Sequence, residues 1–350
     1  MSYEKHSDAK ASRYAWNQPW NPFEVTLSDP TYPMNLEEKN QIPYRFQSVP
    51  DDVPEVPHIE SRYKNLPGNN IYLCCGRLQM SSQYKAFLIS LFALILPGVL
   101  FFIFSAFWLW HHVSPAVPIT FAYLYALAVV SMFKCSTADP GILPRNAYSL
   151  TYNPAHPWSV IPEDRKVLVG STRSDSVFVN TVYCHTCHLY RPPRASHCHL
   201  CDNCVEYLDH HCVWLNTCIG RRNYRYYFIF LLSVVLSALY LTGLGFYTSI
   251  GSFHESTDTN FAAHLRRPWA GVSFFLGIYG ALGAILPGIL FCYQCYLISV
   301  GQNVHEYLRA KNTETEDVHP FHDSIWLNFL VVLCRPKNVS YVRPTRKSYV

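Results

Sequence analysis

Seven cysteines and several histidines crowd into the stretch from Cys184 to Cys218. Cys-x2-Cys pairs are typical of Zn²⁺ sites, because the short turn between them points both thiolates at one metal. Neighbouring side chains in an extended chain point in opposite directions, so we expect His197 and Cys198 to serve different metals in two interleaved sites. Two closed sites take eight ligands and leave one thiol and one imidazole over. The ten best-spaced candidates are Cys184, Cys187, His197, Cys198, Cys201, Cys204, His210, His211, Cys212 and Cys218.

The run Asp209–Cys212 holds a second kind of chemistry. By the same alternation, His210 and Cys212 lie on one side of the chain and His211 on the other. A spare imidazole beside a spare thiol is the arrangement of a nucleophile and its base, and Asp209 is placed to orient the imidazole. We therefore expect a covalent reaction at Cys212, with the metals in a structural role.

The elements that position this cluster are predicted to be membrane helices. The chain has 350 residues, of which 49% are hydrophobic and only 15% charged, whereas soluble domains carry about a quarter charged residues. A bilayer span needs roughly 20 apolar residues, and the uncharged runs are 86–110, 116–133, 226–250 and 270–300. Buried helices of a large soluble protein are the alternative, which four such runs disfavour. The predicted fold is an α-helical polytopic membrane protein whose Cys-rich domain, at about 182–225, lies between the second and third spans.

The distribution of Lys and Arg predicts the orientation. The 134–225 loop holds ten of them, the 251–269 loop two and the 111–115 connection none. The positive-inside rule places the 1–85 tail, the 134–225 loop and the 301–350 tail in the cytosol, and 251–269 in the lumen. Thiols stay reduced in the cytosol, so metal binding is favoured over disulfides. This topology also hides the glycosylation sequon at Asn338.

Other segments carry weaker signals. We expect the first 67 residues or so to be largely disordered, and no apolar run precedes residue 86, so no signal peptide is expected. No internal repeat is evident. Cys74 and Cys75 are possible acylation sites, Cys292 and Cys295 are expected to pack rather than bind metal, and the small net charge of +4 indicates no nucleic-acid partner.

The motif Asp209-His210-His211-Cys212, in this Cys/His spacing, resembles the DHHC family of protein S-acyltransferases. The resemblance continues in Asp139-Pro140-Gly141 and in the run from Cys218 to Tyr224. The stretches at Gly76-Arg77, 191–194 and 334–336 are most similar to the fungal subfamily that acylates Ras proteins.

The resemblance implies a role for each motif residue. One zinc would be held by Cys184, Cys187, His197 and Cys204, and the other by Cys198, Cys201, His211 and Cys218. Cys212 would be the nucleophile, His210 its base and Asp209 the residue that orients His210. Trp214 would face the acyl chain, and Arg191 and Arg194 are candidates for the CoA phosphates, with lipid headgroup or solvent contact as the alternative.

Some positions depart from the family pattern. Val213 stands where a proline usually follows the nucleophile, so the turn loses a preset φ. A Thr-Thr-x-Glu motif is reduced to Asn303-Val304-His305-Glu306, in which only Glu306 matches. Asn328 fits the aromatic-Asn element of the C-terminal tail, and Asp139 is expected near the active site, with a simple helix stop as the alternative.

The family's activity implies a palmitoyltransferase that takes a long-chain acyl group from acyl-CoA and passes it to cysteines of substrate proteins. Substrates with juxtamembrane or C-terminal cysteines, such as Ras-like GTPases, a small accessory subunit, and the endoplasmic reticulum membrane (alternatively the Golgi) follow from the subfamily. Two rival functions are a zinc-binding interaction module and a transporter. The first has no use for a spare thiol beside a spare imidazole, and the second calls for charged residues within the spans.

Overall fold

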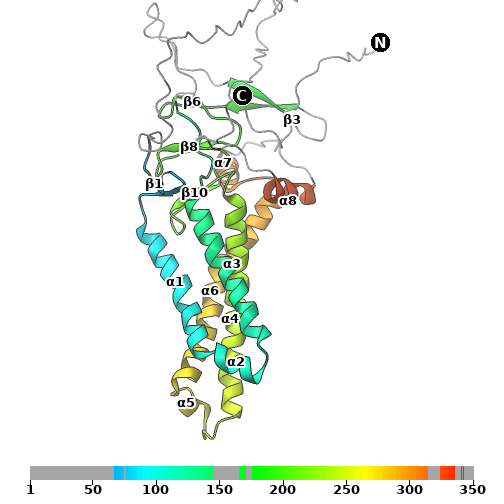
Figure 1. Ribbon diagram of the computed structural model, residues 1–350. Helices are drawn as coiled ribbons and strands as arrows, with labels where there is room; N and C mark the ends of the chain where they lie inside the picture. The colour runs from blue at the N-terminus through cyan, green and yellow to red at the C-terminus, as the bar shows by residue number, and fades with distance from the viewer. Residues whose placement is uncertain are drawn as a thin grey trace, which may run out of the picture.

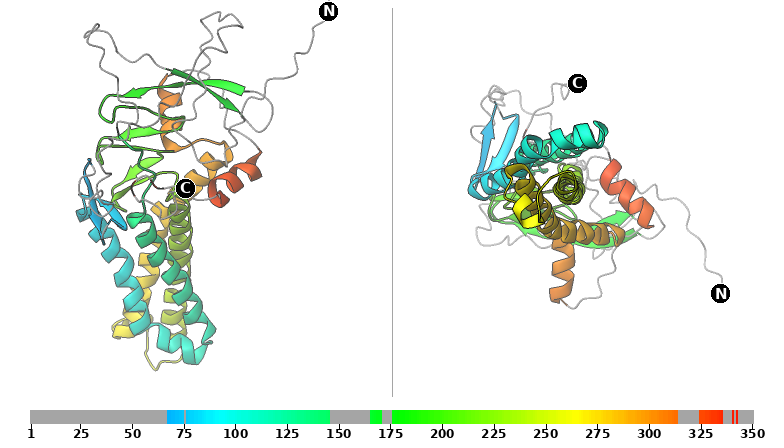
Figure 2. Two further views of the ribbon diagram at one scale, coloured as in Figure 1. Left: turned by 45° about the horizontal axis from the view of Figure 1, so that its top comes forward. Right: turned by 90° about the horizontal axis from the view of Figure 1, so that it is seen from below.

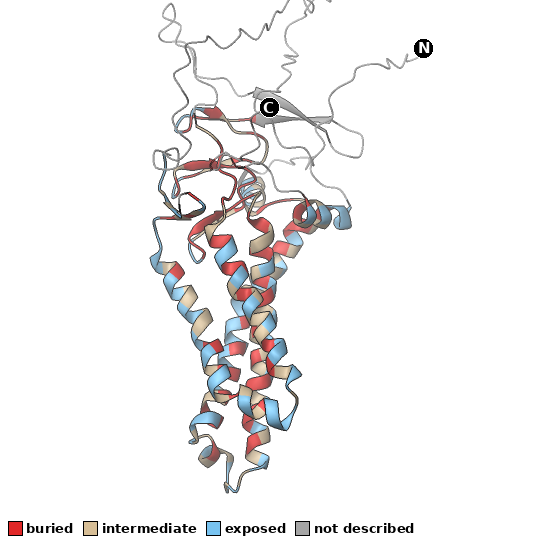
Figure 3. Ribbon diagram, in the orientation of Figure 1, coloured by how far each residue is buried: buried red, intermediate tan, exposed pale blue. Residues whose placement is uncertain are grey.

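The computed structural model describes residues 67–74, 76–145, 165–170, 176–313, 324–335, 340 and 342. Among these residues, four long apolar helices form an elongated bundle with the Cys/His-rich unit at one end (Figure 1). They are α1 (Lys85–Phe104), α3 (Ala116–Thr137), α4 (Tyr224–His254) and α6 (Pro268–Ser299). Their outward faces carry exposed apolar side chains (Figure 3), which suits lipid rather than water. The prediction of a four-helix membrane protein with a Cys-rich unit between the second and third spans is confirmed.

The first apolar stretch is bent. Helix α1 ends at Phe104, and the short helix α2 (Ala106–His112) follows directly after Ser105. The hydroxyls of Ser105 and Ser273 on α6 share a hydrogen bond of 2.8 Å, and both side chains are fully buried. Buried hydroxyls need such partners, so the bend is also the point where the first span is tied to the fourth. The run predicted as one span at 86–110 consists of two helical pieces.

Small residues bring α4 and α6 close together. A Cβ atom at Gly245 would lie 2.5 Å from the Ser273 carbonyl oxygen and 2.6 Å from the Gly277 nitrogen. Membrane helices commonly associate through such residues, because lipid supplies no hydrophobic force between them. At the end near the Cys/His-rich unit the same two helices contribute Tyr227 and Ile298 to one apolar core. The spacing of α4 and α6 therefore sets the positions of the side chains that these helices place next to the Cys/His-rich unit.

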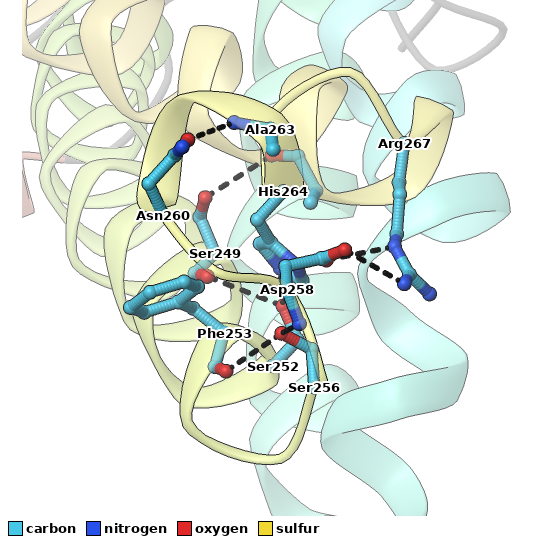
Figure 4. A network of polar contacts seen from close by, with 10 residues as sticks. Ser249, Ser252, Phe253, Ser256, Asp258, Asn260, Ala263, His264 and Arg267 are labelled. Carbon is cyan, nitrogen blue, oxygen red and sulfur yellow. Dashed lines mark hydrogen bonds and ion pairs between the residues drawn. The ribbon is translucent and has the colours of Figure 1, made fainter.

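At the opposite end, a buried polar network closes the connection between α4 and α6 (Figure 4). His264, on the short helix α5 (Phe261–His264), has Nε2 2.9 Å from Ser252 Oγ and Nδ1 2.8 Å from Asp258 Oδ2. Arg267 binds both oxygens of Asp258, at 2.8 and 2.9 Å. The order Ser–His–Asp is that of a hydrolase triad, but Ser252 and His264 are buried and Arg267 neutralises Asp258. These contacts lock a loop and expose no nucleophile.

The Cys/His-rich unit consists of short β-hairpins that repeat every 14 residues. The paired strands are β5 (Tyr183–Cys184) with β6 (Leu189–Tyr190), β7 (Ser196–Cys198) with β8 (Asn203–Val205), and β9 (His210–Cys212) with β10 (Thr217–Ile219). His188, Asp202 and Asn216, also 14 residues apart, all have left-handed backbone, with φ of 50°, 51° and 53°. The expectation that the chain lacks an internal repeat is wrong, because the repeat resides in ligand and turn positions rather than in overall similarity.

Further elements surround the unit. They are β1 (Asn70–Leu73) paired with β2 (Leu78–Ser81), β3 (Arg165–Gly170) paired with β4 (Ser176–Thr181), α7 (Val304–Thr313), and α8 (Ile325–Cys334), which lies beside the bundle at the end near the unit (Figure 2). The Ser81 nitrogen donates to the Asn216 carbonyl at 2.8 Å, so the β1–β2 hairpin ties the start of α1 to the unit. The tail before residue 67, Cys75 and the Asn338 sequon lie outside the described residues.

The α4–α6 contact makes a testable prediction. Gly245→Ala should lower the stability of the bundle, because overpacking against α6 backbone costs about 1–3 kcal/mol. Gly243→Ala on the same helix is the matched control, since a Cβ there meets nothing within 4 Å. Thermal unfolding in detergent micelles checks this, and equal midpoints for the two variants would show that Gly245 does not set the helix spacing.

Candidate functional site

Within the described residues, the structure brings the eight predicted metal ligands together in two groups. Cys184, Cys187, His197 and Cys204 form the first group, and Cys198, Cys201, His211 and Cys218 the second. In the first group the Sγ atoms lie 3.4–3.8 Å from the His Nδ1 atom, and in the second 3.4–3.7 Å. Strand register produces this, because His197 faces Cys204 across one hairpin and His211 faces Cys218 across the next.

These spacings fit Zn²⁺. A tetrahedral ion with Zn–S of about 2.3 Å and Zn–N of about 2.0 Å places neighbouring ligand atoms about 3.5–3.8 Å apart. Hydrogen bonding from Cys204 lowers the pKa of Cys187 to about 5, and hydrogen bonding from Cys201 lowers the pKa of Cys198. Each group thus contains a thiol that readily becomes the thiolate that a metal binds. Four protein ligands complete each site, so zinc in them would be structural.

The two groups differ in what contacts the Nε2 atom of their histidine. His197 Nε2 lies 3.5 Å from Asp202 Oδ1, and Asp202 in turn binds Arg145 at 2.8 Å. A carboxylate in this position fixes the tautomer of a metal-bound imidazole. His211 Nε2 is buried and has no hydrogen-bond partner in the part of the chain that is described. The extra histidines are exposed and belong to neither group: His185, His188 and His199.

Cys212 is the thiol of this unit that both groups leave out. It occupies the place that Cys184 and Cys198 hold in the 14-residue repeat, but the second thiol of its pair is replaced by Leu215. Leu215 is 1% exposed and packs in the apolar core shared with the helix bundle, and the half-buried Cys212 packs against the same core. The third hairpin therefore supplies His211 and Cys218 to the second metal group and uses Leu215 as a hydrophobic anchor on the bundle.

His210 links Asp209 to Cys212. The Oδ2 atom of the buried Asp209 lies 2.8 Å from His210 Nδ1. Burial opposes protonation of His210, but its hydrogen bonds with Asp209 and Cys212 outweigh this and raise its pKa from 6.5 to about 10. An imidazolium ion beside a thiol favours the thiolate. The arrangement prepares Cys212 to attack an electrophilic carbonyl carbon.

Two groups that the sequence analysis did not single out hold Asp209 in place. Gln294 Nε2 on α6 donates to Asp209 Oδ2 at 3.0 Å, and the Val304 nitrogen at the start of α7 donates to Oδ1 at 2.9 Å. The sequence did carry a signal for Gln294, because a polar amide within an otherwise apolar predicted span indicates a functional position. The Val304 contact is made by backbone, so no side-chain pattern announces it.

Glu306 fixes the start of α7. Its nitrogen donates to Asn303 Oδ1 at 2.7 Å, while its Oε2 accepts from the Asn303 nitrogen at 3.0 Å. This reciprocal pair is a capping box. Glu306 also accepts two hydrogen bonds of 2.7 Å from Arg194. The residue that survives from the degenerate motif thus anchors the helix end that holds Asp209.

The predicted exposure of Arg194 to CoA phosphate, lipid headgroup or solvent needs correction. Its side chain is only 8% exposed, and besides Glu306 it binds the Gly301 carbonyl at 2.9 Å and stacks over Tyr207 at 4.3 Å. A bidentate carboxylate is a better partner for a buried guanidinium than water, and only the fold brings it within reach. Arg191 is half-buried, and its contact with a CoA phosphate stays a prediction.

Trp214 lies in the turn that follows Cys212. Its side chain is half exposed, and its carbonyl oxygen accepts a 2.7 Å hydrogen bond from Ser90 on α1. The exposed Val213 begins the same turn, and its carbonyl accepts from the Asn216 nitrogen at 3.3 Å. The turn therefore closes without the usual proline, and Trp214 remains the predicted contact for an acyl chain.

Asp139 and Asn328 brace the chain around the site. Asp139 accepts from the nitrogens of Gly141 and Ile142, at 2.8 and 3.1 Å, and pairs with Arg222 at 3.2 Å. Asn328 donates to the Ser299 carbonyl at the end of α6, at 3.1 Å. These contacts of Asp139 fix the chain just after the end of α3, and the expectation that Asp139 acts near the active site stays a prediction.

Fold and site together define a polytopic membrane protein that holds the Cys212 thiol, outside both Cys/His groups, beside the His210 imidazole. The DHHC palmitoyltransferase family model matches residues 177–311. The chain is 99% identical to palmitoyltransferase erf2 of Schizosaccharomyces pombe over the whole of both chains. It is 38% identical to palmitoyltransferase erf2 of Emericella nidulans over 80% of this chain and 47% of that one, and 32% identical to palmitoyltransferase ZDHHC9 of Danio rerio over 79% and 73%.

The chain therefore belongs to the DHHC palmitoyltransferase family and is an acyltransferase. The match begins just before the first hairpin and ends in α7, so it includes both metal groups, the Asp209–Cys212 motif and the two helices that pack beneath them. The family resemblance that was based on Asp209–Cys212 is confirmed.

The division of thiols predicts zinc content. Cys212→Ser should keep about two zinc ions per chain, because all eight ligands remain. Cys218→Ser is the matched comparison in the paired strand and should lose about one ion. Elemental analysis by mass spectrometry checks this. A loss of zinc from Cys212→Ser would make Cys212 a ligand and leave no free nucleophile.

The Asp209–His210 contact predicts the reactivity of Cys212. Asp209→Asn removes the carboxylate that raises the pKa of His210, so iodoacetamide alkylation of Cys212 at pH 7 should slow by at least about tenfold. Asp258→Asn, at the far end of the bundle, is the charge-matched control. Equal alkylation rates for the two variants at pH 7 would contradict the role of Asp209.

Proposed function

We propose that the chain transfers palmitoyl or a similar long acyl group from acyl-CoA to substrate-protein cysteines through an acyl-Cys212 intermediate. The Cys212 thiolate attacks the thioester carbonyl carbon, its new S–C bond replaces that of CoA, and the departing CoA thiolate takes the proton of His210. In the second half-reaction, neutral His210 accepts the proton of the substrate thiol, whose sulfur displaces Cys212. Asp209 orients His210 in both steps.

The observation that carries this proposal is the position of Cys212 between the polar pair Asp209–His210 and the apolar helix bundle. The thiol packs against a core to which α1, α3 and α4 contribute Phe87, Met132 and Tyr227. Burying an acyl chain yields about 0.8 kcal/mol for each CH₂. A thioester at Cys212 can thus extend its chain among the helices while CoA stays outside. Trp214 is the candidate contact for the chain and Arg191 for the CoA phosphates.

Two Zn²⁺ ions in the two Cys/His groups would hold the hairpins in register. Their part is to support the turn that carries Cys212, and each reacting proton is moved by His210. This division follows from the closed ligand sets, which leave no ligand position for a water molecule.

The proposed orientation places both tails and the site in the cytosol. The Lys/Arg excess of the 134–225 loop supports it, and so do thiols that require a reducing compartment. Acyl-CoA and the target cysteines then meet at the cytosolic face of the lipid bilayer. We assign the chain to the endoplasmic reticulum membrane, with the Golgi as the alternative, on the subfamily resemblance.

Ras-like GTPases with C-terminal cysteines are the proposed substrates, and a small accessory subunit the proposed partner. Both assignments rest on the similarity of this chain to the fungal subfamily. Transfer of label from acyl-CoA to such a GTPase, but not to its Cys→Ser variant, checks the substrate. Equal transfer to an unrelated membrane-anchored thiol protein would contradict a Ras preference.

Acylation mapping tests the intermediate directly. The detergent-purified chain, with and without a candidate subunit, is incubated with palmitoyl-CoA, and peptide mass spectrometry locates the adduct. We expect a hydroxylamine-labile thioester on Cys212 that is lost in Cys212→Ser and kept in Cys295→Ser, a half-buried thiol on α6. Substrate acylation that survives Cys212→Ser would overturn the proposal.

A further inference from the structure

Gln294 is an amide buried to 2% exposure on α6, one of the membrane-spanning helices. Its Oε1 accepts a 2.6 Å hydrogen bond from the hydroxyl of Tyr224 on α4, and its Nε2 donates to Asp209 Oδ2 at 3.0 Å. A buried polar side chain in a membrane helix is costly unless it is satisfied. Both the Oε1 and the Nε2 atom of Gln294 have a hydrogen-bond partner, and the partner of Nε2 is the Asp209 carboxylate.

The orientation of this amide is fixed by its two neighbours. Because the Asp209 carboxylate can only accept hydrogen bonds, the NH₂ end must face Asp209, and the oxygen end then accepts from the Tyr224 hydroxyl. A flipped amide would place its oxygen against the carboxylate. Asp209 then receives donors from His210, Gln294 and the Val304 nitrogen, two on Oδ2 and one on Oδ1. A carboxylate is an acceptor for all three.

We propose that Gln294 is a positioning residue for the acyl-transfer reaction, with Tyr224 as its support. Gln294 aims Asp209 Oδ2 at His210 Nδ1, and so sets the orientation of His210 toward the Cys212 thiol. The amide suits this place because it donates a hydrogen bond to Asp209 and adds no further charge to that of His210. This inference rests on the proposed role of Cys212 as the acyl carrier.

A purely structural link between α4 and α6 is the rival explanation. Such a link would affect unfolding and zinc content, and its loss would act on catalysis whether or not Asp209 is present. A positioning role acts only through Asp209. The two roles are therefore separated by measuring Gln294 variants with and without the Asp209 carboxylate.

The first measurement is the rate of acyl-Cys212 formation by the full chain in detergent at increasing palmitoyl-CoA. Gln294→Leu should lower the saturating rate on the order of 10- to 100-fold and leave the half-saturating concentration unchanged, because only orientation at the reacting thiol is lost. Tyr224→Phe should act in the same direction with a smaller effect. Tyr279→Phe is the matched control, because that α6 hydroxyl binds the Ala93 carbonyl at 2.8 Å, away from the site.

The second measurement repeats Gln294→Leu in the Asp209→Asn background. The expected result is no further loss of rate, with zinc content and unfolding midpoint close to those of Asp209→Asn alone. An undiminished loss in that background, or a wild-type rate for Gln294→Leu, would overturn the positioning role. Loss of the adduct in Cys212→Ser, measured in parallel, keeps the proposed function intact in either case, whereas an adduct that persists there refutes the proposed function itself.

Discussion

Thiolates and imidazoles packed within a few ångströms of one another are stable only around a cation, and this constraint governs the Cys/His-rich unit. The buried interior of the unit consists largely of the ligands themselves, with Leu143, Leu189 and Ala195 packed among Cys184, Cys187 and Cys204. A unit of this size buries too little apolar surface to fold on its own. Metal ligation by the two Cys/His groups would replace the missing core, and the positions of the other site residues would depend on it.

The third hairpin shows how a reactive thiol is obtained from this scaffold. His211 and Cys218 face each other across its strands and belong to the second metal group. Strand alternation turns the neighbours His210 and Cys212 the other way, toward the core where Leu215 is anchored. The second Cys/His group on one side and the helix bundle on the other thus hold Cys212, which belongs to neither metal group.

Local spacing was sufficient to predict the membrane spans, two interleaved metal sites and the Asp209–Cys212 motif, because these features lie within short stretches of sequence. The exact division of the eight ligands between the two sites came from the family resemblance. The 14-residue repeat is hard to predict from the sequence, because its third copy keeps Cys212 but has Leu215 in place of the second thiol. The partners of Arg194 and Asp139 could not be found this way. Glu306 lies 112 residues from Arg194 in sequence, and only the packing of α7 on the unit brings the two together.

The end of α6 explains why the degenerate motif at 303–306 still supports the site. The lost side-chain pattern matters little, since Val304 binds Asp209 through its backbone nitrogen and Asn303 with Glu306 caps the helix. Gln294 on α6 and Val304 just beyond it contact opposite oxygens of the same carboxylate. Gln294 lies near the end of α6, and Val304 follows only a few residues beyond it. A shift of α6 against the hairpins of the Cys/His-rich unit would therefore displace both donors. The position of Asp209 relative to His210 is therefore set by α6, the membrane helix that also packs near Cys212. The orientation of His210 depends on the position of that helix.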